Sequence, residues 1–171
     1  MIFIEDVTGF APGSEQERAG IVGAGRELLD SIIDLRVPRI LLIVRNAYGG
    51  AYASYNNYPT GADAVFALPS ARIAVMGPAG RQFIYKDEFR AILADFRKAM
   101  ETPAAAAERD RRMAELTRRY ERELMNPEEA LKLGSVSRLV MPGYSRKVVG
   151  EYLQFLMRHY IPSPMAAVQR E

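Results

Sequence analysis

Residues 39–55 read RILLIVRNAYGGAYASY, and this stretch indicates the fold class. Residues 39–44 predict a strand, and its continuous apolar run from Ile40 to Val44 is typical of a parallel strand that is buried on both faces of its sheet. Residues 46–50 predict a tight turn, and residues 51–58 predict the helix that follows it. A strand, a glycine-rich turn and a helix in this order indicate an α/β protein.

The same alternation precedes this stretch. Residues 1–7 predict a strand, and the glycines and proline of residues 8–13 predict a loop. From Glu15 an apolar stripe at helical spacing predicts one helix that runs up to Pro38. Ser14, three residues before Glu17, predicts a capping box at the start of that helix.

Strands and helices also alternate to the end of the chain. Asn126 followed by Pro127 predicts a helix start, and Gly134 predicts its end. We expect strands at 64–68, 72–75 and 136–141, a turn at 76–80, and helices at 87–100, 103–124 and 145–159. The prediction is a single domain over residues 1–171, with a core at 1–85, a helical region at 86–134 and a last strand and helix at 135–160.

The composition excludes several classes of protein. The chain has 171 residues, no cysteine, one histidine and a formal net charge of +2. Such a small charge argues against nucleic acid and against an anionic membrane surface as partners. Too few cysteines and histidines are present for a typical metal site, so we expect no metal. The apolar runs are too short for a membrane span, and the N-terminus does not resemble a signal peptide, so we expect a cytoplasmic protein.

The glycine turn carries the chemical hypothesis. Glycines let the backbone approach a ligand closely, and the first N–H groups of a helix have no intrahelical partners. The N–H groups of Gly50 and Ala51 could therefore stabilise an oxyanion, and the loop with Gly9 and Phe10 could add a further N–H. No catalytic side chain is required. These local features alone fit two ordinary turns equally well.

A series of motifs resembles one known family. In chain order the motifs are DVTGFAPGSEQE at 6–17, VP at 37–38, RNAYGGAY at 45–52, GAD at 61–63 and ARIAVMGP at 71–78. Their order and spacing resemble the carboxyltransferase family of biotin-dependent acyl-CoA carboxylases and decarboxylases. From residue 103 onward only the general plan matches, with long helices, a turn that contains Gly134, a strand and a final helix.

The resemblance implies a crotonase-like fold of ββα units and the biotin-facing, C-terminal domain of such an enzyme. It implies that the backbone of Gly50, Ala51 and Phe10 holds the ureido oxygen of biotin. The implied reaction releases CO2 from carboxybiotin, moves a proton from the acyl-CoA α-carbon to biotin, and joins the carbanion to CO2. The neighbouring positions implied to bind biotin or substrate are Gly9, Tyr48, Gly49, Tyr52, Ala53, Met76, Gly77 and Pro78, and Ala53 is associated with the choice of acyl chain.

The resemblance also implies partners. It covers one domain and lacks that domain's opening strand–helix portion, which would leave a sheet edge exposed. We therefore expect a second carboxyltransferase chain that supplies the missing strands and the acyl-CoA site, in a hetero- or homo-oligomer. Biotin is expected on a separate carrier protein or domain, and a coenzyme A thioester is expected as substrate.

Several alternatives remain open from the sequence. The reaction could run in reverse as a decarboxylase, or the chain could be another crotonase-type enzyme or a structural subunit. A hydratase or isomerase would need a carboxylate beside the hole, for which Glu5 and Asp6 are the nearest candidates. His159 predicts a surface residue rather than part of a catalytic triad, and the charged segments 108–112 and 118–123 predict solvated helix faces rather than a site for CoA phosphates.

Overall fold

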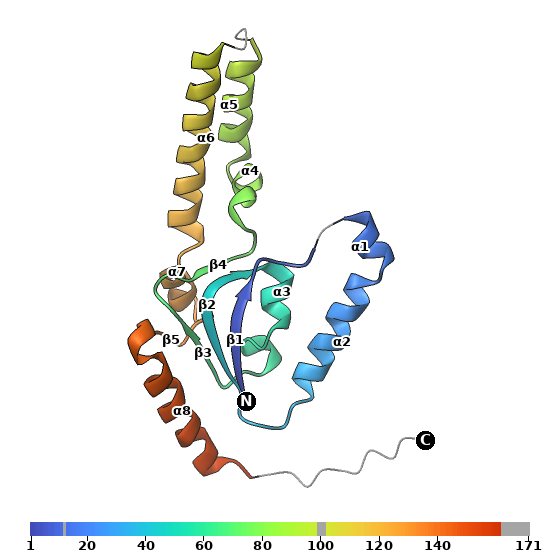
Figure 1. The fold of residues 1–171 in the computed structure, drawn as a ribbon, viewed down its shortest axis with the longest axis vertical. Helices are drawn as coiled ribbons and strands as arrows, with labels where there is room; N and C mark the ends of the chain where they lie inside the picture. Colours follow the sequence, from blue (N-terminus) through green and yellow to red (C-terminus); the bar gives the residue numbers. More distant parts are fainter. Residues whose placement is uncertain (12, 99–101, 162–171) are drawn as a thin grey trace.

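The computed structural model of the protein describes residues 1–11, 13–98 and 102–161 (Figure 1). Its centre is a parallel sheet, as predicted, with strands in the order β1-β2-β3-β5 and with β4 paired to β2. The strands are β1 (Ile2–Val7), β2 (Ile40–Tyr48), β3 (Ala64–Ala67), β4 (Arg72–Ala74) and β5 (Arg138–Leu139). The long strand β2 pairs first with β3 and then, past Val44, with β4.

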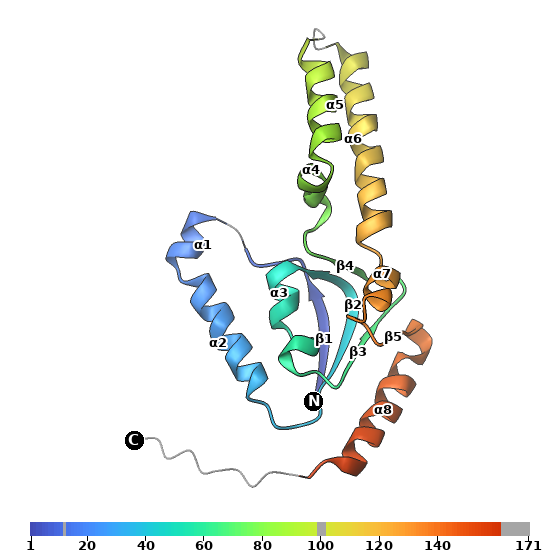
Figure 2. The ribbon, with the colours of Figure 1, turned by 180° about the vertical axis from the view of Figure 1, so that it is seen from behind.

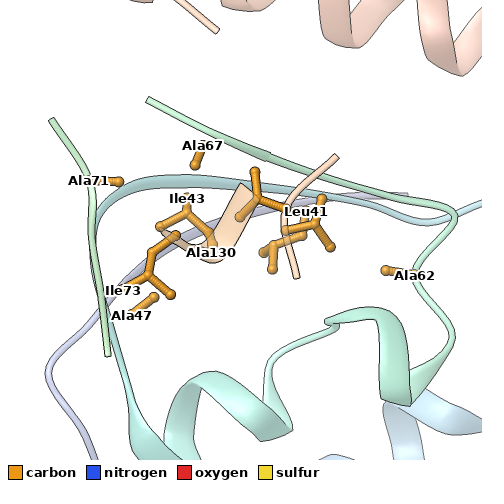
Figure 3. Close-up of a cluster of buried hydrophobic side chains, with 10 residues drawn as sticks. Leu41, Ile43, Ala47, Ala62, Ala67, Ala71, Ile73 and Ala130 are labelled. Atoms are coloured by element: carbon orange, nitrogen blue, oxygen red, sulfur yellow. The ribbon is translucent and has the colours of Figure 1, made fainter. Parts of the chain in front are cut away.

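Helices cover both faces of this sheet (Figures 1 and 2). On one face lies α3 (Gly49–Ser54), with α1 (Ser14–Arg18) and α2 (Ile21–Ile33) outside it, and on the other face lies α8 (Ser145–His159). Leu41 and Ile43 join the α3-side core drawn in Figure 3, whereas Ile40 and Leu42 pack toward α8. Burial on both faces explains the uninterrupted apolar run in the sequence.

A helical hairpin extends away from the sheet (Figures 1 and 2). It consists of α5 (Lys86–Lys98) and α6 (Pro103–Leu124), flanked by the short helices α4 (Arg81–Ile84) and α7 (Pro127–Lys132). Ion pairs join its two arms, from Arg112 to Asp95 at 2.8 Å and from Arg119 to Glu88 at 3.0 Å. Among the described residues, no helix is both long enough and apolar enough to cross a bilayer.

The predicted boundary between β2 and α3 was wrong. The sequence predicted a turn at residues 46–50, but β2 continues to Tyr48 and α3 begins at Gly49. The cause is β4, because Asn46, Ala47 and Tyr48 lie in register with Arg72, Ile73 and Ala74. A neighbouring strand supplies the hydrogen bonds that keep these residues extended, and the local sequence does not reveal that neighbour.

Three further predictions were wrong and two were confirmed. The single helix expected after Glu15 is broken at Gly20, which has a φ of 83°, and the capping box is absent because Gly13 is the N-cap. The strand expected at 136–141 has only two residues in its ladder. Helix α6 has the predicted bounds, and Asn126 caps α7 by accepting a hydrogen bond from the Glu129 N–H at 2.9 Å. Residues 99–100 of the helix expected at 87–100 lie outside the described residues.

Three single 3-10 turns complete the described elements. They are η1 (Tyr58–Thr60), η2 (Pro78–Gly80) and η3 (Pro142–Tyr144). The turn η2 leads from β4 into α4, so it connects the sheet to the base of the helical hairpin. The hairpin thereby begins beside the carboxyl end of β2, which is where the glycine turn lies.

Candidate active site

The turn between β2 and α3 requires glycine for a reason that the structure makes specific. Gly49 has a φ of 59°, and a Cβ atom added there would lie 2.9 Å from the Val75 backbone oxygen. The N-cap residue Tyr48 makes no side-chain hydrogen bond to the first turn of α3. The first N–H groups of this helix, which include Gly50 and Ala51, therefore remain as hydrogen-bond donors without intrahelical acceptors.

The second predicted loop lies directly against this turn. A Cβ atom added at Gly50 would lie 3.4 Å from Cε2 of the Phe10 ring. The ring therefore packs over Gly50, and Phe10 remains 45% exposed. The structure thus brings Phe10 and Gly50 together although 39 residues separate them in the chain, counted from their positions.

Asp6 holds the two motifs in register. Its carboxylate accepts hydrogen bonds from the backbone N–H of Asn46 at 3.1 Å and from its Nδ2 at 2.8 Å. It also lies 2.6 Å from Nη2 of Arg45. The hydrogen bond from Arg45 is the main cause that lowers the pKa of Asp6. Asp6 therefore remains charged and ties the carboxyl end of β1 to the end of β2.

An apolar cavity of about 620 Å³ opens beside the glycine turn. From the turn itself it is lined by Gly49, Gly50 and Tyr52. The other walls come from the end of β4 and from the helices at the base of the hairpin, namely Ile73, Ala74, Val75, Ile84, Tyr120, Leu124, Glu129, Ala130, Leu133 and Ser135. Such a cavity can hold a flat or aliphatic group next to the free N–H donors.

The sequence missed the walls that come from α4, α6 and α7. Leu124 and Leu133 are 43% and 80% exposed, and they end their helices as apolar side chains without a core to enter. Apolar residues at the base of a charged hairpin were the available signal. Leu124 and Leu133 lie more than 70 residues from Gly50 in the chain, which hid their contact with the turn.

Other predicted site residues lie around the cavity but do not line it. Tyr48 is 6% exposed, its ring is 3.3 Å from the position of a Cβ at Gly77, and its hydroxyl donates to Asn46 Oδ1 at 2.9 Å. The Tyr48 ring therefore packs against the loop that contains Met76, Gly77 and Pro78. The backbone oxygen of Met76 accepts a hydrogen bond from the Tyr120 hydroxyl at 2.9 Å.

Gly9 and Ala53 lie outside the cavity as well. Gly9 has a φ of 115°, which gives the loop after β1 its sharp bend toward Phe10. Ala53 is exposed on α3 and does not belong to the cavity wall. Its predicted role in the choice of acyl chain stays a prediction.

The carboxylates that the sequence offered as acid–base candidates do not reach the cavity. Asp6 is engaged by Arg45 and Asn46. Glu5 is 1% exposed, neither of its carboxyl oxygens has a hydrogen-bond partner, and burial raises its pKa to about 8. Burial also raises the pKa of Tyr52 to about 12, with the charge of Glu5 as the second cause. Glu5 therefore lies close enough to Tyr52, which lines the cavity, to affect the pKa of its hydroxyl.

His159 does not contribute to this site. It lies in the last turn of α8, and its ring packs against Phe155 with centroids 5.6 Å apart. Helix α8 covers the face of the sheet opposite α3 (Figures 1 and 2). The prediction that His159 is a surface residue near the end of the last helix is therefore confirmed.

The fold is α/β, with a glycine turn at the carboxyl end of β2, and comparison with known proteins identifies the family of the chain. Residues 1–170 match the carboxyl transferase domain family. The chain belongs to this family. The family assignment that the motifs suggested is thus confirmed.

Named relatives agree with this assignment. The chain is 37% identical over 147 residues to the putative propionyl-CoA carboxylase beta chain of Bacillus subtilis, covering 85% of this chain and 26% of the relative. It is 36% identical over 157 residues to the methylmalonyl-CoA decarboxylase subunit alpha of Propionigenium modestum, covering 91% of this chain and 28% of the relative. The chain thus spans between a quarter and a third of these relatives.

Solved structures agree with the architecture. The crystal structure of transcarboxylase 12S with hydrolysed methylmalonyl-coenzyme A matches with a TM-score of 0.75 at 30% identity, over 99% of this chain and 30% of that one. The beta subunit of P. aeruginosa geranyl-CoA carboxylase, at 23% identity, shares the fold with a TM-score of 0.67, over 94% of this chain and 29% of that one. These neighbours have the carboxyltransferase fold that the sequence predicted.

Proposed function

We propose that the protein transfers a carboxyl group between carboxybiotin and the α-carbon of an acyl-CoA, in either direction. The observation that carries this proposal is the contact of Phe10 with Gly50, because it joins two loops whose N–H groups could form one hole. Family membership supplies the chemistry, and relatives that are named as carboxylases and decarboxylases leave the direction open.

The residues of this chain fit the biotin side of that reaction. The N–H groups of Gly50, Ala51 and Phe10 would donate hydrogen bonds to the ureido oxygen, and the apolar cavity would accommodate the ring system beside them. When bound, carboxybiotin supplies the carboxyl group and accepts the proton that the acyl-CoA α-carbon gives up. The described residues then need only to orient the ring, stabilise the charge on the oxygen and exclude water.

A second chain would complete the site. β1 lies at the edge of the sheet, and its Ile2 and Ile4 are 43% and 64% exposed. An open edge with exposed apolar side chains favours contact with another polypeptide. We assign to that polypeptide the acyl-CoA side of the reaction, and we assign biotin to a separate carrier. The related transcarboxylase 12S assembles as a hexamer, which supports an oligomeric assembly here.

Gly50→Val in the purified complex tests the hole. The added side chain would meet the Phe10 ring at the 3.4 Å position and screen the N–H donors, so we expect kcat to fall by about a hundredfold or more. The assay is transfer of the carboxyl group from methylmalonyl-CoA to free biotin. Gly143→Val, at an exposed glycine with open space around it, is the control and should keep the wild-type rate.

The same assay separates the alternatives. A structural subunit would tolerate Gly50→Val with no change in the rate of the complex, and that result would refute a catalytic role. A hydratase or isomerase would need an acid–base carboxylate in the cavity. Glu129 lines the cavity, but its carboxylate is engaged in an ion pair with Lys132 Nζ at 2.6 Å. Turnover of an acyl-CoA that proceeds unchanged in the presence of avidin would exclude biotin and sink the proposal.

A further inference from the structure

Helix α2 contains two glycines whose surroundings differ sharply. Gly23 is exposed, and a Cβ atom added there would have no neighbour within 4 Å. Gly25 is buried, and a Cβ atom added there would lie 2.9 Å from Cζ of the Phe10 ring. A glycine inside a helix costs about 0.5–1 kcal/mol relative to alanine. Gly25 therefore occupies a position where helix propensity disfavours it but packing demands it.

The Phe10 ring lies between two glycines of different helices. Its Cζ and Cε1 atoms face Gly25 of α2, with the added Cβ at 2.9 and 3.2 Å. Its Cε2 and Cδ2 atoms face Gly50 of α3, with the added Cβ at 3.4 and 3.6 Å. The ring thus fills a slot that exists because neither helix has a side chain there. A methyl group at Gly25 would push the ring toward Gly50 or out of the slot.

We propose that Gly25 is a positioning residue for the oxyanion hole: by admitting the Phe10 ring to the slot over Gly50, it fixes the loop that supplies the Phe10 N–H. This inference rests on the proposed function. Gly25 belongs to α2 and lies outside the cavity beside the glycine turn. It acts through Phe10, because the side chain held in the slot and the N–H assigned to the hole belong to one residue.

Open space on the outer side of the Phe10 ring would let a side chain at position 25 displace the ring. A second cavity, of about 490 Å³, lies between the loop after β1 and α2, and both Phe10 and Gly25 line it. Phe10 is 45% exposed, so a displaced ring has room to leave the slot. Gly9, with a φ of 115°, and Gly13, with a φ of 125°, flank the loop and give it freedom to follow the ring. Displacement of the ring would therefore release the loop that carries the Phe10 N–H from its anchor in the slot, without unfolding the protein.

The experiment compares Gly25→Ala with Gly23→Ala in the purified complex. Both substitutions add a methyl group to α2 and improve helix propensity, but only the first meets Phe10. For transfer from methylmalonyl-CoA to free biotin, we expect Gly25→Ala to lower kcat at least tenfold, with the KM for methylmalonyl-CoA changed less than twofold. Gly23→Ala should keep both parameters. Thermal unfolding, followed by circular dichroism, should show both variants folded.

A second background tests whether the effect passes through the ring. Leucine at position 10 lacks the Cε1 and Cζ atoms that would clash, so Gly25→Ala should lower kcat less than twofold when it is added to Phe10→Leu. Equal losses in both backgrounds would overturn the inference, as would a Gly25→Ala variant with the kcat of Gly23→Ala. If the wild-type complex shows no biotin-dependent transfer, the proposed function fails instead, and the two failures are distinguishable.

Discussion

At the scale of single residues, the least expected feature is the buried carboxyl group of Glu5. It lies on β1 in register with Ile43, 1% exposed, and has no hydrogen-bond partner for either oxygen. Desolvation disfavours the charged form, which raises its pKa from 4.5 to about 8. Tyr52 of α3 is the titratable group whose pKa Glu5 affects in turn. Glu5 is therefore neutral at pH 7, and the pH dependence of stability tests whether its carboxyl group is buried.

The stability of the protein should depend on pH through Glu5. Between pH 4.5 and about 8 the unfolded chain releases the proton of Glu5 and the folded chain keeps it, so the free energy of unfolding falls as pH rises through this window. Glu5→Gln cannot ionise and should remove this slope. At pH 7 we expect the variant to be more stable than the wild type by on the order of 1–3 kcal/mol, measured by urea unfolding. At pH 4.5 the two proteins should have similar stabilities, and parallel curves across the window would contradict the burial of Glu5.

At the scale of elements, the junction of β2 and α3 depends on β4. The carbonyl of Val75, directly after β4, lies where a side chain at Gly49 would project, and Gly49 has a left-handed φ. The left-handed φ and the nearby Val75 carbonyl are therefore two independent reasons for glycine at position 49. The same junction carries the donors of the proposed hole, so its geometry links the packing of the sheet to the proposed chemistry.

Gly49→Ala tests this junction, with Gly134→Ala as its matched control. Both glycines have positive φ, of 59° and 75°, but only Gly49 has an atom within 4 Å of an added Cβ. We expect Gly134→Ala to cost about 1 kcal/mol of unfolding free energy from backbone strain alone, and Gly49→Ala about 2–4 kcal/mol because a clash with a backbone oxygen is added. Urea unfolding of both variants measures the difference. Equal costs would show that the contact with Val75 is absent.

At the scale of the whole molecule, one side of the sheet remains open. β1 has β2 as its neighbour and is the first strand in the described sheet order, and Ile4 is 64% exposed on it. The chain spans 26% of the Bacillus subtilis relative and 30% of the transcarboxylase 12S chain, so most of each relative has no counterpart in this chain. The proposed second chain would cover this edge.

Ile4→Lys tests that assembly. A charge on the edge strand should oppose association, so we expect the mass of the complex to fall in analytical ultracentrifugation, together with its carboxyl-transfer rate. The stability of the isolated chain should change by less than about 0.5 kcal/mol, because Ile4 is exposed there. Ile161→Lys, at a residue that is 87% exposed beyond α8, is the control and should leave the mass unchanged. An unchanged mass for Ile4→Lys would exclude this edge as the interface.

Features that depend on near neighbours in the chain could be predicted without coordinates. The bounds of α6 and the Asn126 cap of α7 follow from local hydrogen bonds and propensities, and the apolar run of β2 follows from its burial on both faces. The motifs likewise identified the family and the glycine turn. The extension of β2 to Tyr48 could not be predicted in this way, because the partners that keep it extended belong to β4.

Tertiary contacts also determine the details of the candidate site. The slot for the Phe10 ring needs Gly25 and Gly50, and the cavity needs walls from α6 and α7, which are far from the glycine turn in the chain. The burial of Glu5 depends on neighbours that are distant in the chain, such as Ile43 and Tyr52, which a lone acidic residue in a strand pattern does not reveal. In each case the determining neighbour is distant in sequence, so local periodicity carries no information about it.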